Sequence, residues 1–143
     1  MNLNFGSFCL NFLVFRYGSL ANAAAKPDGL AILATFYHIQ EDDNDVMSQL
    51  TSKLKDLKQP DVIAKATDLS LANFIPRKHY TSEFYRYKGS LTTPGCSESV
   101  TWTVFRHTLP ISEGQMSSFR ALYDGQGQPL VNNFRPLQPL YGR

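Results

Sequence analysis

Few residues of this sequence have side chains that bind metals, and they lie far apart. The three histidines are His38, His79 and His107, and no HxH, HxxxH or HExxH spacing occurs among them. The two cysteines, Cys9 and Cys96, form no CxxC pair, so neither a zinc knuckle nor a thioredoxin-type dithiol is indicated. They could form a long-range disulfide, remain free thiols, or bond to partners outside the chain. The residues alone predict no metal site.

Other catalytic patterns are also missing. No G-x-S-x-G motif supports a serine nucleophile, and Gly125 and Gly127 belong to a turn-rich segment rather than to a phosphate-binding loop. One stretch stands out, the sequence GSLTTPGCSESVTW from Gly89 to Trp102, in which two threonines and a proline precede a cysteine and an alternating apolar segment. Adjacent threonines are common in strands, so the pair has meaning only through its surroundings.

Composition indicates one sheet-rich domain. The chain has 143 residues, of which 43% are hydrophobic and 13% aromatic, with ten Phe and seven Tyr, and aromatic residues favour strands. The net charge of +2 is too small to indicate a nucleic-acid or anionic-membrane surface. No apolar run is long enough to form a transmembrane segment.

The elements around these residues can be predicted from local patterns. A turn at Lys26–Gly29 precedes a continuous apolar run, Leu30–Tyr37, which is typical of a strand buried on both faces. The next helix is predicted from about Val46 to Leu57, with Asn44 or Asp45 as its N-cap. Its apolar stripe is formed by Val46, Leu50, Leu54 and Leu57.

Two further strands and a second helix follow. Strands are predicted at Glu83–Gly89 and at Glu98–Phe105. A helix is predicted to begin at Ser112, with Gln115 completing a capping box. One face of the second strand carries Val100, Trp102 and Val104, and the buried side of the helix carries Met116 and Phe119. The expected fold class is mainly β, with peripheral helices.

The N-terminal segment, residues 1–15, is atypical. The apolar run Phe8–Phe15 and the small residues Ala21–Ala25 imitate a secretory signal and its cleavage site. No Lys or Arg precedes the run, and Arg16 and Tyr17 interrupt the approach to the cleavage site. A signal-like segment is therefore one interpretation of this start.

Four ordered motifs resemble the α-class carbonic anhydrases, zinc enzymes that interconvert CO₂ and bicarbonate. The central motif is YKGSLTTPGCSESVTWTVF, Tyr87–Phe105. It is preceded by Tyr17–Leu33 and followed by Ile111–Leu122 and by NNFRPLQPL, Asn132–Leu140. The resemblance implies that residues 16–143 form part of a carbonic anhydrase domain, which has one large twisted, mostly antiparallel sheet with helices on its surface.

The resemblance also implies roles for the opening motif. Thr92 matches the threonine that orients the zinc-bound hydroxide, and Thr93 lies at the position beside bicarbonate. Four further residues match positions that line the apolar CO₂ pocket, a role compatible with ordinary core packing: Leu91, Ile32, Val100 and Trp102. CO₂ and bicarbonate are thus the expected small-molecule partners.

Departures from the family pattern concern the metal. The family's three zinc histidines precede the segment that begins at Tyr17, and this chain has no matching H-x-H pair. Ungapped placement puts Cys9 at the third ligand position, and one ligand does not make a zinc site. The family's glutamate partner of Thr92 and its proton-shuttle histidine are also missing. We expect that this chain alone binds no zinc and is inactive. The alternative is a non-catalytic carbonic-anhydrase-related binding module.

Cys96 is the residue that bears on whether the protein is secreted. It matches a cysteine that is disulfide-bonded in secreted and membrane-tethered family members, which favours a secreted lineage. The location of this chain itself is left open by the sequence.

Overall fold

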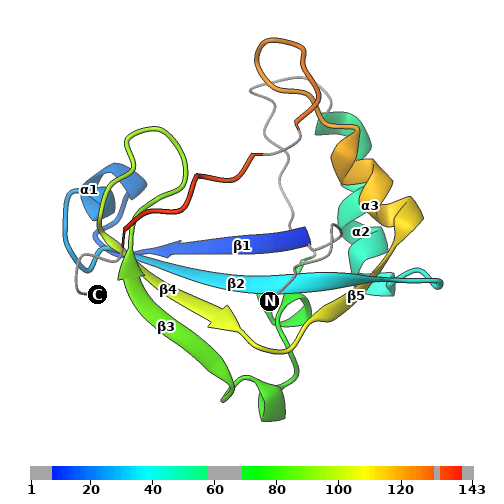
Figure 1. Ribbon diagram of the computed structural model, residues 1–143, viewed down its shortest axis with the longest axis horizontal. Coiled ribbons are helices and arrows are strands. Elements are labelled where there is room, and N and C mark those ends of the chain that lie inside the picture. Colours follow the sequence, from blue (N-terminus) through cyan, green and yellow to red (C-terminus); the bar gives the residue numbers. More distant parts are fainter. Residues whose placement is uncertain (1–7, 58–68, 131–132, 140–143) are drawn as a thin grey trace.

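The computed structural model describes residues 8–57, 69–130 and 133–139. These residues form a five-stranded mixed sheet with helices at its two ends (Figure 1). The strands are β1 (Phe8–Phe15), β2 (Leu30–Gln40), β3 (Phe84–Gly89), β4 (Val100–Phe105) and β5 (Leu109–Ser112). The helices are α1 (Leu20–Ala24), α2 (Asp45–Leu54) and α3 (Glu113–Arg120), with single 3₁₀ turns at Lys55–Leu57, Leu71–Phe74 and Lys78–Tyr80. The predicted class, mainly β with peripheral helices, is confirmed.

The strand order is β1-β2-β4-β3, and β5 also pairs with β2. The outer pairs β1–β2 and β3–β4 are antiparallel, whereas β4 and β5 both run parallel to β2. The central strand β2 is buried on both faces, as its continuous apolar run predicts: Ile32 and Ala34 are buried on one face and Thr35 and Tyr37 on the other.

Each face of the sheet carries its own apolar cluster. The first contains Ala23, Leu30, Ile32, Ala34, Val100 and Trp102. The second contains Tyr37, Met47, Phe74 and Ile111, against which side chains of β1, α2 and α3 pack. Figure 1 shows α2 and α3 side by side at one end of the sheet and α1 at the other. The second cluster thus joins the helices to the sheet.

The helix starts follow the predicted caps. The Asn44 side chain accepts hydrogen bonds from the backbone N–H groups of Val46 and Met47, at 3.0 and 3.3 Å, so Asn44 rather than Asp45 caps α2. The capping box of Ser112 and Gln115 is present at α3. Three of the four residues of the predicted stripe face the core: Leu54 is buried, and Val46 and Leu50 pack against the second cluster. Met47 and Thr51 are buried as well, and Leu57 lies in the 3₁₀ turn that follows the helix.

Two strands are not predicted from the sequence. The apolar run Phe8–Phe15, with its signal-like pattern, forms β1 and pairs with β2 along its whole length. The short strand β5 pairs with the last residues of β2. In the described ranges, no helix is long and apolar enough to cross a membrane.

Candidate functional site

Strands β2 and β4 bring the predicted pocket residues together. Their parallel register places Ile32 beside Trp102 and Leu30 beside Val100. Ile32, Val100 and Trp102 are only 5%, 1% and 7% exposed, and Leu91 packs against the same cluster. We call Leu91, Ile32, Val100 and Trp102 the apolar wall.

The loop between β3 and β4, residues 90–99, carries the threonine pair. Two backbone hydrogen bonds close it, from Leu91 N–H to Ser97 O and from Cys96 N–H to Thr93 O, each 3.0 Å. Gly95 has φ of 99°, a conformation that glycine adopts without strain and proline cannot. Thr92 and Thr93 are both exposed on this closed loop, next in sequence to Leu91 of the apolar wall.

Trp102 anchors the start of the loop to the sheet. Its indole N–H donates to the Ser90 carbonyl at 3.0 Å, and its ring lies parallel to that of Tyr87, with centroids 6.2 Å apart and an interplanar angle of 5°. From the C-terminal segment, Arg135 donates to the Ser90 hydroxyl. Tyr87, Ser90 and Arg135 are positioning residues that the sequence did not single out, although all three lie inside the quoted motifs.

Cys9, on β1, packs against the first apolar cluster, to which the apolar wall belongs. Burial raises the pKa of its thiol to about 11, so the thiol is protonated at neutral pH. Burial also raises the pKa of the Tyr87 hydroxyl. The negative charge that Cys9 carries once its thiol ionises at high pH raises the pKa of Tyr87 further. Cys96 donates a weak hydrogen bond to the Thr93 carbonyl at 3.4 Å. Both cysteines are free thiols in this structure, so of the three alternatives the Cys9–Cys96 disulfide is not formed.

The histidines have local partners rather than one another as co-ligands. His38 Nδ1 is 2.8 Å from the Thr108 hydroxyl. The rings of His79 and His107 both contact the ring of Tyr80 at tilted angles of 47° and 36°, with centroids 3.8 and 4.1 Å apart. Across residues 8–57, 69–130 and 133–139, no group of three or more His, Cys, Asp or Glu side chains could hold a metal ion. Because zinc needs three or four such ligands, the donors in the described residues do not fit a zinc site.

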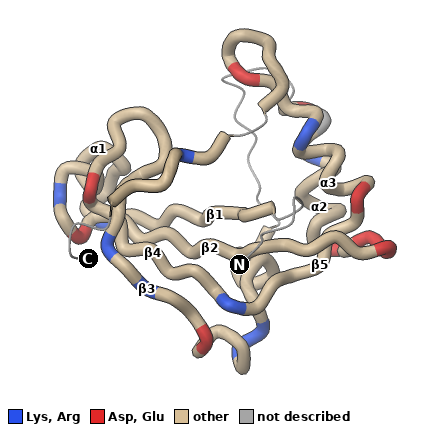
Figure 2. The backbone as a smooth tube through the Cα atoms, in the orientation of Figure 1, with Lys and Arg blue, Asp and Glu red and all other residues tan. Residues whose placement is uncertain are grey.

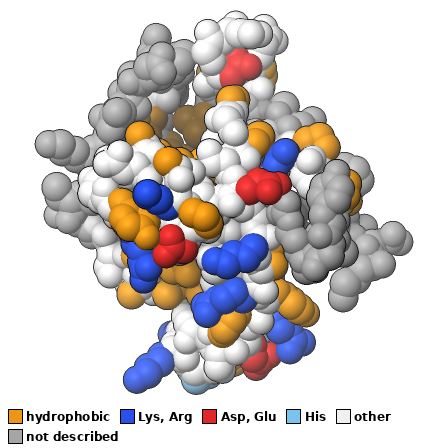
Figure 3. Space-filling model, turned by 90° about the vertical axis from the view of Figure 1, so that its left-hand side faces the viewer, with side chains coloured by type: hydrophobic (Ala, Val, Ile, Leu, Met, Phe, Trp, Pro, Cys, Tyr) orange, Lys and Arg blue, Asp and Glu red, His pale blue; other side chains and the backbone are white. Residues whose placement is uncertain are grey.

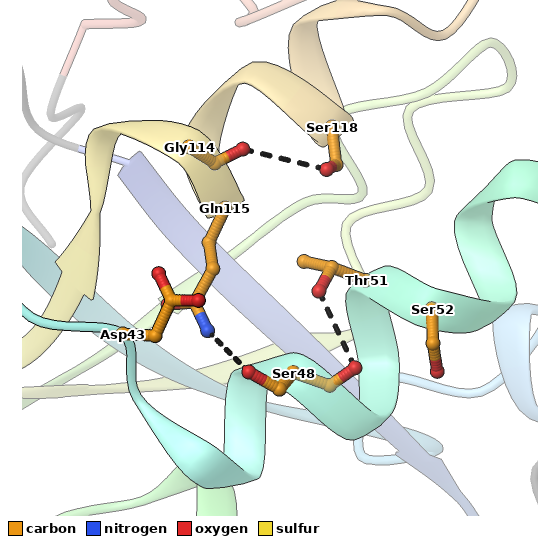
Figure 4. Close-up of a pocket in the computed structure, with 7 residues that line it drawn as sticks. All are labelled: Asp43, Ser48, Thr51, Ser52, Gly114, Gln115 and Ser118. Carbon is orange, nitrogen blue, oxygen red and sulfur yellow. Dashed lines mark hydrogen bonds between the residues drawn. The ribbon is translucent and has the colours of Figure 1, made fainter.

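A separate polar hollow lies between α2 and α3 (Figure 4). It is lined by Asp43, Ser48, Thr51, Ser52, Gly114, Gln115 and Ser118. Both polar atoms of the Gln115 side chain have hydrogen-bond partners within the chain. The amide nitrogen donates to Asn44 O and to the Ser48 hydroxyl, both at 2.8 Å, and the amide oxygen accepts from the N–H groups of Asn44 and Ser112. These bonds tie the starts of the two helices together, which gives the hollow a structural role.

On the side of the molecule that carries α1, hydrophobic side chains lie among basic ones, and a hollow with a hydrophobic floor opens above them (Figure 3). This surface carries side chains of both charges (Figure 3).

Comparison with known proteins identifies the domain. The family model of eukaryotic-type carbonic anhydrases matches residues 10–143. This chain belongs to the eukaryotic-type carbonic anhydrase family. Mouse carbonic anhydrase 15 is 42% identical over 134 residues, which cover 90% of this chain and 41% of that protein. Human carbonic anhydrase 7 is 40% identical over 138 residues, covering 90% and 48%. Rat carbonic anhydrase 4 is 38% identical over 129 residues, covering 88% and 42%.

This member of the carbonic anhydrase family therefore spans less than half the length of the curated relatives it matches. The match begins inside β1, so most of that strand belongs to the family domain as well.

Proposed function

We propose that this chain supplies the CO₂-facing side of a carbonic anhydrase site. The observation that carries the proposal is the apolar wall, four side chains from two strands and a loop that belong to one cluster, and in the loop Leu91 of this wall directly precedes Thr92 and Thr93. An apolar, water-excluding surface suits CO₂, which has no charge and only weak hydrogen-bonding groups.

Thr92 is the orienting residue in this proposal, and Thr93 lies beside the bicarbonate product. A threonine hydroxyl can donate one hydrogen bond and accept others, so it can fix the direction of a bound hydroxide nucleophile. The closed backbone of residues 90–99 and the Trp102 anchor support this role, since an orienting group must itself be held in place.

In the family, zinc supplies the nucleophile. The described donors of this chain do not fit that ion, so we assign no metal step to it. The 143-residue polypeptide alone is therefore proposed not to hydrate CO₂. A non-catalytic binding module is the second candidate, because a family member that no longer hydrates CO₂ would also lack zinc-ligating residues.

A chimera separates the two candidates. The part of human carbonic anhydrase 7 that lies before the position aligned with Arg16 would be fused to residues 16–143 of this chain, and CO₂ hydration would be followed by stopped flow. We expect hydration by the chimera, inhibited by an aromatic sulfonamide, and none by the 143-residue chain. Thr92→Val in the chimera should lower kcat by about 100-fold or more.

Thr92→Ser is the matched control, because it keeps the hydroxyl, and it should retain most of the activity. A folded chimera that binds zinc but hydrates no CO₂ would argue for the binding module. Equal rates for Thr92→Val and the unmodified chimera would contradict the role of Thr92.

A further inference from the structure

The C-terminal segment, residues 133–139, reaches the loop that carries the threonine pair. Residues 133–139 form no helix or strand, and Figure 1 shows them, in red, running toward the loop between β3 and β4. Arg135 is the one charged residue of this segment (Figure 2). One terminal nitrogen of the Arg135 guanidinium donates to the Ser90 hydroxyl, and the other donates to Gln138 Oε1 at 3.2 Å. Arg135 therefore links the segment to the first residue of the loop.

Ser90 is held from two sides. Its carbonyl accepts the Trp102 indole N–H at 3.0 Å, and its hydroxyl accepts a hydrogen bond from the Arg135 guanidinium. Gly89 makes room for the indole: it is buried, and a Cβ at this position would lie 2.9 Å from Cδ1 of Trp102. The bond from Arg135 has a charged donor, and such hydrogen bonds are stronger than those between neutral groups. The start of the loop is thus bonded both to the sheet and to the C-terminal segment.

The place of Ser90 sets the place of the threonine pair. Thr92 follows Ser90 by two residues, and Leu91 between them packs against the first apolar cluster. The backbone bond from Leu91 N–H to Ser97 O, at 3.0 Å, closes the loop just after Ser90. A displacement of Ser90 therefore carries the Thr92 backbone with it.

We propose that Arg135 is a positioning residue for Thr92, because its hydrogen bond to the Ser90 hydroxyl fixes the start of the threonine loop. Arg135 itself takes no part in the chemistry. The effect on catalysis rests on the function proposed above, whereas the effect on the loop does not. A displacement of about 1 Å at a group that orients a reactant costs up to about 100-fold in rate, so loss of this bond should be measurable.

Hydrogen exchange of the 143-residue chain, followed by NMR, tests the effect on the loop. Arg135→Met removes the donors, and the Leu91 and Cys96 N–H groups, which close the loop, should then exchange about 10-fold faster. Arg120→Met is the matched control: it removes the same kind of side chain from α3, where Arg120 pairs with Glu113, and should leave the loop unchanged. Equal exchange rates of the two N–H groups in both variants would overturn the proposal.

CO₂ hydration by the chimera described above tests the effect on Thr92. Per bound zinc, Arg135→Met and Ser90→Ala should each lower kcat/KM by about 10-fold, and the double variant should lower it no further, because both changes remove the same bond. Arg135→Lys keeps a donor and should recover part of the rate. A fully active Arg135→Met chimera, or additive losses in the double variant, would contradict the positioning role.

Failure of this inference differs from failure of the proposed function. If the Thr92→Val chimera hydrates CO₂ as fast as the unmodified chimera, the proposed function fails, and the exchange rates alone decide whether Arg135 holds the loop. If Thr92→Val is impaired and Arg135→Met is not, the proposed function stands and Arg135 does not position Thr92.

Discussion

Trp102 is the residue on which the candidate site depends most. It packs beside Ile32, stacks on Tyr87 and bonds the Ser90 carbonyl, so it connects β2, β3 and the threonine loop. Its place on the buried face of β4 is predictable from alternation with Val100 and Val104. Its contacts with Tyr87 and Ser90 are not, because they depend on strand pairing and on the path of the loop.

Replacement of Trp102 by Phe should destabilise the fold. The aromatic packing is largely kept, but the Ser90 carbonyl loses its donor, and a lost part-buried hydrogen bond costs about 1–3 kcal/mol. Urea unfolding followed by circular dichroism measures the change. Leu137→Ala is the control, since Leu137 is fully exposed and its loss should have little effect. Equal stabilities for Trp102→Phe and the wild type would contradict the anchor.

Cys9 should react slowly in the folded chain. Its pKa is raised by burial from 9.0 to about 11, so at pH 8 the reactive thiolate is about 100-fold rarer than in the unfolded chain. In a Cys96→Ser variant, iodoacetamide alkylation should be slower in buffer than in urea by about this factor. Equal rates would show that the Cys9 thiol is not buried against the first apolar cluster.

The raised pKa of Cys9 also makes the free energy of unfolding depend on pH. Because the folded pKa lies above the unfolded one, the contribution of the protonated thiol is fully present below about pH 9 and is lost as pH rises through about 11.

At the scale of elements, the helix pair is held by a polar contact rather than by apolar packing alone. Gln115 is 4% exposed and bonds Asn44, Ser48 and Ser112. Its capping box was predictable from the local sequence. Its hydrogen bonds to Asn44 and Ser48 were not predictable, because they join two helices that are far apart in the sequence.

Replacement of Gln115 by Leu should therefore cost more stability than the loss of a cap. The side-chain volume is similar, but the buried N–H groups of Asn44 and Ser112 would lose their acceptor, whereas the Asn44 carbonyl keeps the Ser48 N–H. The expected loss of stability is about 2–4 kcal/mol. Urea unfolding measures it, with Ser117→Ala on the exposed side of α3 as the control. A loss no larger than that of the control would mean that water replaces the Gln115 bonds.

At the scale of the whole molecule, local patterns predicted β2, β3, β4 and both capped helices to within a few residues. Strands β1 and β5 were missed because their sequences indicate a strand only weakly. The apolar run Phe8–Phe15 is equally typical of a secretory signal peptide, and Leu109–Ser112 is short and contains a proline. The grouping of the apolar wall followed from the family resemblance, since no periodicity links Leu91 on a loop to Ile32 on β2.

Our central proposal is that this chain carries the substrate side of a carbonic anhydrase domain and that its described residues hold no zinc donor set. The most direct test is the zinc content of the tag-free 143-residue chain after incubation with excess zinc and dialysis, measured by mass spectrometry beside full-length human carbonic anhydrase 7. We predict far less than one zinc per folded chain. One tightly held zinc per chain would contradict the account.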